Sequence, residues 1–347
     1  MAEITQKIEI STASVFRALL VILGFYLLYR LSGVVLVLLF AIVIASAVQP
    51  FVRWFEGRGV PRVVAVLVLY LLIFALGVVL SSLVIPSVLS DMSSLSSYLP
   101  KFTAQLSTSL DQAQAGAPRY LDFLGEIQNI VGAISGYLQQ VSQSALDLVA
   151  SAFGGVISFL AIVVISFYLA TMKNGVEGFL KAVIPERYEG YIVNLWQRVE
   201  AKVGLWLQGQ LLLALIVGLL VFVGLSLLRV KFSLLFAILA MLLEIIPVAG
   251  PVLAAIPAIF VALLQSPILG LYVLIMWIII QQTESHVLVP LVLGKTLGMN
   301  PIVVILAILV GSELAGIPGA LLGVPVATII VEILDDMARL KTSRRAA

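Results

Sequence analysis

Long apolar runs separated by short polar segments dominate the chain. A helix needs about 20 apolar residues to cross the roughly 30 Å hydrocarbon layer of a membrane. The runs that meet or approach this length are 16–29, 32–52, 63–85, 151–172, 204–228 and 267–285. Two longer apolar blocks, 232–265 and 301–336, exceed a single crossing, and proline and glycine interrupt each of them near its middle. The pattern predicts an all-α polytopic membrane protein with about eight hydrophobic helical segments, in which the two interrupted blocks form broken helical hairpins.

The stretch 86–147 has a different pattern. It is rich in serine and glutamine, and its apolar residues recur at spacings of three and four, which is typical of one face of a helix. We expect Pro100 to divide the first apolar run and residues 116–118 to separate it from a second run over 120–141. The stretch therefore predicts an amphipathic helical hairpin on the outer surface, which either packs on itself and the bilayer or contacts another subunit. A second amphipathic segment, 176–200, is expected to form an interfacial helix on the cytoplasmic side.

Composition narrows the class of protein. Of the 347 residues, 62% are hydrophobic and 11% are charged, whereas about a quarter of the residues in a soluble domain are charged. The mean hydropathy is +1.18, so a water-soluble enzyme is excluded. A net charge of +2 leaves no basic face for nucleic acid. The absence of cysteine and the single histidine exclude disulfides and Cys/His metal sites, and we expect neither a metal nor a cofactor. A polytopic membrane protein remains, and membrane proteins of this size mostly move solutes.

Lysine and arginine are distributed unequally between the loops. With a cytoplasmic N-terminus, fifteen of them fall on the inside and five on the outside. Loops rich in lysine and arginine stay in the cytoplasm. We therefore expect a multi-pass protein of the cytoplasmic membrane with both termini in the cytoplasm.

The two broken blocks share the same order of an acidic residue, a helix break and a proline. In each, an acid precedes the break and a proline follows that acid by thirteen or twelve positions, as in Glu244 with Pro257 and Glu313 with Pro325. The first hairpin would enter the membrane from outside and the second from inside, which makes the two an inverted repeat. Each arm has about 15 residues and is roughly 22 Å long. This is short for a crossing, so the sequence predicts re-entrant hairpins whose tips meet inside the membrane.

This interpretation divides the chain into five parts. They are N-terminal transmembrane helices (1–85), an extracytoplasmic amphipathic segment (86–150), a transmembrane helix with an interfacial helix (151–203), a transport core with the two hairpins (204–338) and a basic cytoplasmic tail (339–347).

The first break is the first candidate site. A break in a membrane helix frees backbone groups that lipid cannot satisfy, so breaks occur where the backbone is buried in protein or lines a watery cavity. Pro247, Gly250 and Pro251 form this break, and Glu244 precedes it inside an apolar block. A lone carboxylate within a membrane typically marks an ion or proton site. The alternative role for Glu244 is to cap backbone amides that the break frees.

A polar cluster at the cytoplasmic end of the run 267–285 is the second candidate. It consists of Gln281, Gln282, Glu284 and His286. On a helix, residues 282 and 286 share one face, and residues 281 and 284 lie close to each other. The cluster either binds a polar solute or relays protons, or it is simply the solvated end of a helix.

The second break supplies the third set of candidates: Ser312, Glu313, Gly316, Pro318 and Gly319. Gly319 and Gly323 form a small-residue motif that predicts close contact between the arms of this hairpin. Further along, the acids Glu332, Asp335 and Asp336 are expected to be solvated at the cytoplasmic end.

Several of these segments together resemble the autoinducer-2 exporter family of bacterial and archaeal membrane proteins. The resemblance rests on 50–62 (PFVRWFEGRGVPR), Gly209 with Gln210, 244–251 (EIIPVAGP), 281–284 (QQTE), Pro290, Gly294 with Lys295, Pro301 and 316–325 (GIPGALLGVP). It implies an elevator-like transporter that does not hydrolyse ATP and that forms homo-oligomers, namely pentamers. Some members of the family export autoinducer-2, and others exchange sodium for protons.

Three functions remain open from the sequence. The first is a secondary transporter of a small polar solute, driven by an ion gradient. The second is a sodium/proton antiporter that uses Glu244 and Glu313. The third is a non-transporting membrane scaffold or channel, which the broken hairpins disfavour. The expected partners are thus a small polar solute, sodium or protons, the lipid bilayer and further copies of the chain.

Overall fold

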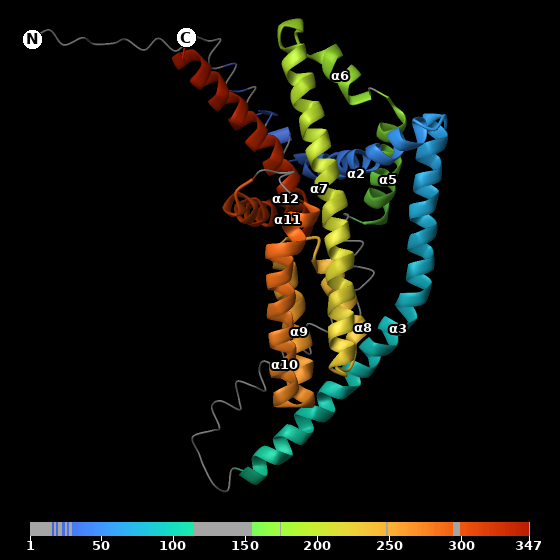
Figure 1. Ribbon diagram of the computed structural model, residues 1–347, viewed down its shortest axis with the longest axis vertical. Coiled ribbons are helices and arrows are strands. Elements are labelled where there is room, and N and C mark those ends of the chain that lie inside the picture. The colour runs from blue at the N-terminus through green and yellow to red at the C-terminus, as the bar shows by residue number, and fades with distance from the viewer. Residues whose placement is uncertain are drawn as a thin grey trace, which may run out of the picture.

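The computed structural model describes residues 16, 19, 23–24, 26–27, 30–113, 155–173, 175–247, 249–293 and 299–346. Within these residues the regular structure is helical, without a strand. The helices, which Figure 1 shows, are α2 (Ser32–Glu56), α3 (Arg62–Ala113), α5 (Val156–Thr171), α6 (Gly175–Val183), α7 (Glu186–Leu227), α8 (Ser233–Leu243), α9 (Ala249–Gln265), α10 (Pro267–Thr283), the π-helix η2 (Glu284–Leu288), α11 (Val289–Val292) and α12 (Pro301–Ala346).

Several of these helices are suited to a membrane. By length and composition, five described ranges could cross it: Ser32–Glu56, Arg62–Ser87, Glu186–Leu227, Pro267–Val292 and Ile302–Arg339. The bent pair formed by α5 and α6 would make a sixth. The all-α, multi-pass architecture expected from the apolar runs is therefore confirmed.

Helices α7, α8, α9 and α10 form an antiparallel bundle along the long axis of the molecule (Figure 1). Each contributes a fully buried side chain to one apolar core, namely Val221, Phe236, Ala258 and Val273. Polar contacts fix the direction of the helices. The Lys231 amide after α7 donates to Gln265 Oε1 at the end of α9 (3.3 Å), and Trp277 Nε1 of α10 donates to the Pro251 carbonyl near the start of α9 (3.1 Å). Helices α8 and α9 are thus the two arms of the first predicted hairpin.

Helix α12 is the second hairpin. Its backbone leaves the helical region at Ala315 and Gly316, where φ of Gly316 is +60°, a value that glycine adopts without strain. The two arms then touch through backbone: a Cβ on Gly319 would lie 1.9 Å from the Gly311 carbonyl oxygen, and one on Gly323 would lie 2.4 Å from that of Ala307. The predicted contact between the arms is confirmed. The range Ile302–Arg339, although long enough to cross a membrane, folds back on itself.

Helices α2, α3 and α5 pack together around Arg62. Its guanidinium donates to the Ala170 carbonyl at the end of α5 (2.9 Å) and to Gln49 Oε1 of α2 (2.8 Å), and it forms an ion pair with Glu56 (3.2 Å). The Ala170 oxygen is one of the last carbonyls of α5, which have no hydrogen-bond partner within the helix. Arg62 therefore caps the C-terminal end of α5 and also connects the three helices.

Two expectations about helix boundaries are wrong. Helix α3 continues through Pro100 to Ala113, and it curves toward the lower end of the molecule in Figure 1. Residues 186–200, expected to form part of an interfacial helix, are instead the first turns of the 42-residue α7, and only α6 is separate. The predicted run 120–141 and most of the run 16–29 lie outside the described residues.

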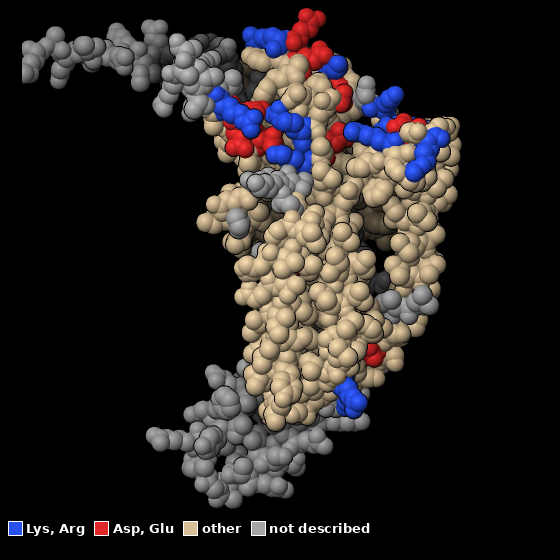
Figure 2. All heavy atoms as spheres, in the orientation of Figure 1, with Lys and Arg blue, Asp and Glu red and all other residues tan. Residues whose placement is uncertain are grey.

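Charged side chains gather at one end of the molecule. Figure 2 shows lysine, arginine and acidic residues at the upper end, where Figure 1 places α6, the start of α7 and the end of α12. The long apolar body below carries few of them until Arg229 and Lys231 at the other end of α7.

Candidate functional site

The break between α8 and α9 brings backbone segments unusually close. Helix α8 ends at Leu243, and α9 begins at Ala249. Gly250 is buried, and a Cβ at this position would lie 1.9 Å from the Leu243 carbonyl oxygen. Only glycine fits at this contact without a shift of backbone. The described part of the short loop, residues 244–247, is therefore held tightly between the two arms.

The break leaves backbone groups that need partners inside the protein. The side-chain amide of Gln210, on α7, donates to the Glu244 carbonyl. The Gly250 amide donates to the Ile246 carbonyl at 2.9 Å, and the Ala249 amide donates to the Pro247 carbonyl at 2.7 Å. The Gly250 bond is a regular i→i−4 helical bond, while the bonds from Gln210 and Ala249 satisfy two further backbone carbonyls inside the protein. Gln210 is 2% exposed, so its bond to the break is shielded from solvent.

The carboxyl group of Glu244 is the polar centre of this region. The residue is 1% exposed, and its Oε2 has no hydrogen-bond partner. Its carboxyl group interacts directly with that of Glu284, which is 6% exposed. The structure thus joins the first and second sequence candidates into one carboxyl pair. Two negative charges repel strongly in a low-dielectric interior, so a cation or a shared proton between them would stabilise the pair.

Glu284 begins the π-helix η2. Pro290 lies just beyond it and has no amide hydrogen to donate to the carbonyl four residues earlier, and its ring would clash with that carbonyl. A wider π-turn relieves this clash and is common at functional sites. Gln281 Nε2 donates to Glu284 Oε2 at 3.3 Å. The predicted closeness of residues 281 and 284 is therefore confirmed.

The remaining members of the second candidate cluster face outward. Gln282 and His286 are exposed, as is the neighbouring Ser285, while Glu284 is buried. His286 Nδ1 lies 3.1 Å from the Gln282 carbonyl oxygen, one turn earlier. The π-helix therefore divides the cluster into an inner face, with Gln281 and Glu284, and an outer face, with Gln282 and His286.

The second break places its candidates elsewhere. Ser312, Glu313 and Gly316 are exposed, and the Ser312 hydroxyl donates to the Leu309 carbonyl at 2.8 Å. Pro318 is half-buried and lines a cavity of about 130 Å³ with residues of α2 and α5. Gly319 is buried at the contact between the arms. Glu244 is thus paired with Glu284, and Glu313 lies at the surface.

The first break borders a larger apolar cluster. Ile246 packs against this cluster, which includes residues of α2, α5, α7 and both arms of α12. The break that carries Glu244 is therefore connected to the second hairpin through a shared cluster, while contact between the two tips stays a prediction.

Glu332 is not solvated, contrary to expectation. It is 6% exposed and forms ion pairs with Arg198 (3.0 Å) and Lys202, both on α7. Arg198 also pairs with Asp336, while Asp335 is exposed. These pairs attach the second arm of α12 to α7 near the charged end of the molecule.

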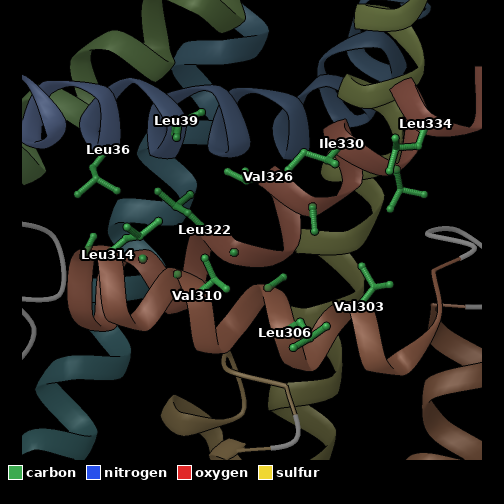
Figure 3. A pocket seen from close by; sticks show the side chains of 17 residues that line it. Leu36, Leu39, Val303, Leu306, Val310, Leu314, Leu322, Val326, Ile330 and Leu334 are labelled. Atoms are coloured by element: carbon green, nitrogen blue, oxygen red, sulfur yellow. The ribbon is translucent and has the colours of Figure 1, made fainter. Parts of the chain in front are cut away.

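An apolar groove of about 470 Å³ runs between α2 and the two arms of α12 (Figure 3). All of its lining residues are leucine, isoleucine, valine, alanine or glycine, such as Leu39, Val310 and Val326. Such a lining suits hydrocarbon and offers no side-chain hydrogen bond to a polar solute. Polar chemistry is therefore available at the carboxyl pair and not in this groove.

Sequence reasoning did not include Gln210 among the site residues. The signal was present, because Gln210 is a polar residue within the apolar run 204–228. Within the described ranges, no group of three or more histidine or acidic residues is placed to hold a metal ion.

The comparisons with known proteins point to transport. The family described as "AI-2E family transporter" matches residues 16–339. The AI-2 transport protein TqsA of Escherichia coli is 30% identical over 303 residues, which cover 86% of this chain and 83% of TqsA. Two proteins of Bacillus subtilis are also similar: YueF is 27% identical over 84% of this chain and 81% of its own length, and YrrI is 28% identical over 88% and 87%.

Proposed function

Because the chain belongs to the AI-2E family of transporters, we propose that it is a secondary transporter that moves a small polar solute across the cytoplasmic membrane, coupled to an ion gradient. The relative TqsA is named as an AI-2 transport protein, which favours an autoinducer-2-like signal or a related metabolite as the solute.

One observation carries this proposal: the buried carboxyl group of Glu244 at the break between α8 and α9, with Oε2 unpartnered. Acidic groups buried in membrane proteins mark ion and proton pathways. Interrupted helices, in turn, are where transporters bind substrate and coupling ion. The Gln210 amide and the Gly250 contact hold the backbone of the break in shape, and so they fix the point from which the Glu244 side chain extends.

The two hairpins are the elements that we propose to move during transport. Helix α8 has 11 residues and is about 16 Å long at 1.5 Å per residue, far less than the hydrocarbon thickness of roughly 30 Å. This length supports a re-entrant hairpin. Because Ile246 packs against an apolar cluster that includes residues of both arms of α12, a movement of either hairpin would disturb the packing beside the break that carries Glu244. We propose that the two hairpins form an inverted repeat and move in an elevator-like way within a homo-oligomer, a pentamer by family resemblance.

A sodium/proton antiporter is the second candidate function. The pairing of Glu244 with Glu284 favours it, because two buried carboxyl groups can hold either one monovalent cation or one shared proton. The Gln281 amide bonded to Glu284 would orient the second carboxyl group. The sequence predicts an antiporter that uses Glu244 and Glu313, whereas the antiporter proposed here uses Glu244 and Glu284.

Glu244→Gln tests both candidates in proteoliposomes. Glutamine keeps the volume and hydrogen-bonding capacity of glutamate but does not ionise. We expect gradient-driven uptake of autoinducer-2 to fall to the level of protein-free vesicles, while the folded protein and its oligomer persist in size-exclusion chromatography. The matched control is Glu186→Gln, an exposed position at the start of α7, which should transport normally.

The same vesicles separate the two candidates. A sodium gradient that moves protons, read with an entrapped pH dye, in the absence of any organic solute indicates the antiporter. Uptake of the solute that depends on the gradient indicates the solute transporter. Full gradient-driven flux by a folded Glu244→Gln variant would contradict the coupling role and leave Glu244 only the capping role.

A further inference from the structure

The turn between α2 and α3 carries a basic and aromatic patch, defined here as Arg53, Trp54 and Arg58. All three residues are exposed. Three apolar helices reach this level: α2 ends here, α3 begins here, and the end of α5 is tied to it by the bond from Arg62 to Ala170. In Figure 2, lysine and arginine side chains appear at the corner where Figure 1 places the start of α3. The patch thus lies where apolar helices give way to polar surface, which is the level of lipid headgroups.

The two arginines of the patch do not form ion pairs with neighbouring acidic side chains of the described residues. Glu56, the acid of this turn, is already paired with Arg62. Within the described part of the chain, neither Arg53 nor Arg58 forms an ion pair. Glu200 of α7 faces Arg53 and Arg62 at longer range and lowers the local positive charge without a bond. Two guanidinium groups therefore remain open toward the membrane surface.

Arg58 is held in position by an aromatic ring. Its guanidinium carbon lies 3.2 Å from the centroid of the Trp54 ring, a stacked cation–π arrangement. Stacking leaves the edge of the planar guanidinium, with its N–H donors, free to contact a phosphate in two places. The indole itself is suited to the membrane interface, and the side chain of Phe51, 52% exposed on the same turn of α2, adds apolar surface.

We propose that the patch is a binding site for the headgroup phosphate of an anionic phospholipid. The two arginines would contact the phosphate, while Trp54 and Phe51 would lie against the glycerol and upper acyl region. A lipid fits better than a free phosphate ion, because the exposed aromatic surface beside the charges has no role in binding an ion. Anionic lipid held here would fix the height of the α2–α3 turn in the membrane. This inference does not depend on the transported solute.

Native mass spectrometry of the full chain from mixed micelles tests the site. The protein is equilibrated with phosphatidylglycerol and phosphatidylcholine, and the lipid that remains bound is counted. We expect wild type to retain phosphatidylglycerol in preference. Each surface arginine contributes about 1 kcal/mol to binding of anionic lipid, about fivefold in affinity. The double variant Arg53→Gln/Arg58→Gln should therefore lose the preference by well over tenfold.

The matched control is Arg229→Gln/Lys231→Gln, which removes the same charge at the opposite end of α7. It should keep the preference of wild type. Equal retention of phosphatidylglycerol by the Arg53→Gln/Arg58→Gln variant would overturn the proposal, and so would an equal loss in the control, because either result would mean diffuse attraction rather than a site. Circular dichroism of both variants confirms that they are folded.

Discussion

At the scale of single residues, Gly250 determines the shape of the first hairpin through the absence of a side chain. The backbone of Leu243 occupies the space where a Cβ would stand, so the two arms approach each other backbone to backbone. This contact brings the end of α8 to the start of α9 and leaves Glu244 at the turn. The position of the Glu244 backbone thus depends on Gly250, which has no side chain.

Gly250→Ala is expected to destabilise the protein. A methyl group 1.9 Å from a carbonyl oxygen forces backbone to move, and overpacking of this kind costs about 1–3 kcal/mol. SDS-induced unfolding, followed by tryptophan fluorescence, measures the change in the free energy of unfolding. Gly77→Ala is the control, since nothing lies within 4 Å of a Cβ there. Equal stability of both variants would contradict the close contact.

Residue types in the sequence identified the members of the site but not their pairing. The sequence predicts Glu244 and Glu284 separately as candidate site residues, because each is a polar group near apolar runs, but the two lie forty positions apart. Only the antiparallel packing of α8, α9 and α10 brings the carboxyl groups together. Gln210 was not predicted as a site residue, because a single amide in an apolar run does not show by itself which group it binds. Its role becomes clear only from the structure, where it donates to the Glu244 carbonyl at the break.

At the scale of elements, proline alone did not predict where helices end. The breaks that follow Leu243 and Leu314 each combine a nearby proline with a glycine that is either in close contact or at positive φ. Pro100 has no such glycine beside it, and α3 continues through it, because a proline removes one hydrogen bond without supplying a turn. Likewise, the amphipathic pattern of 176–200 predicts a separate interfacial helix, but Arg198 and Lys202 pair with α12, and residues 186–200 belong to the longer α7.

Glu332→Gln tests this connection between α7 and α12. The substitution removes the charge that binds Arg198 and Lys202 while keeping the shape of the side chain. Hydrogen bonds to charged groups contribute about 1.5–3 kcal/mol each in net terms. Partial exposure of both cations favours the lower part of this range. Thermal unfolding in detergent should show a clear fall in the melting temperature.

The control for this prediction is Asp335→Asn, an exposed acid three positions further along α12. A surface change of this kind shifts stability by no more than about 0.5 kcal/mol. If both variants melt together with wild type, the ion pairs do not stabilise the contact between α7 and α12.

At the scale of the whole molecule, the distribution of charge sets an orientation. The upper end in Figure 2 carries most of the described lysines and arginines, and the lower end carries Arg229 and Lys231. Helix α7 joins these two ends with 42 residues, about 63 Å of helix, which exceeds the thickness of a bilayer with its headgroups. By the positive-inside rule, the upper end should face the cytoplasm.

Cysteine labelling in intact cells tests this orientation directly, because the chain has no cysteine of its own and single-cysteine variants carry no background. Gly190→Cys lies near the start of α7, where nothing lies within 4 Å of a Cβ, and Lys231→Cys lies at an exposed position beyond its end. A membrane-impermeant maleimide should label Lys231→Cys in intact cells and Gly190→Cys only after the membrane is permeabilised. The opposite pattern would reverse the orientation. Labelling of both in intact cells would mean that α7 does not cross the membrane, since a crossing helix cannot present both of its ends to the same side.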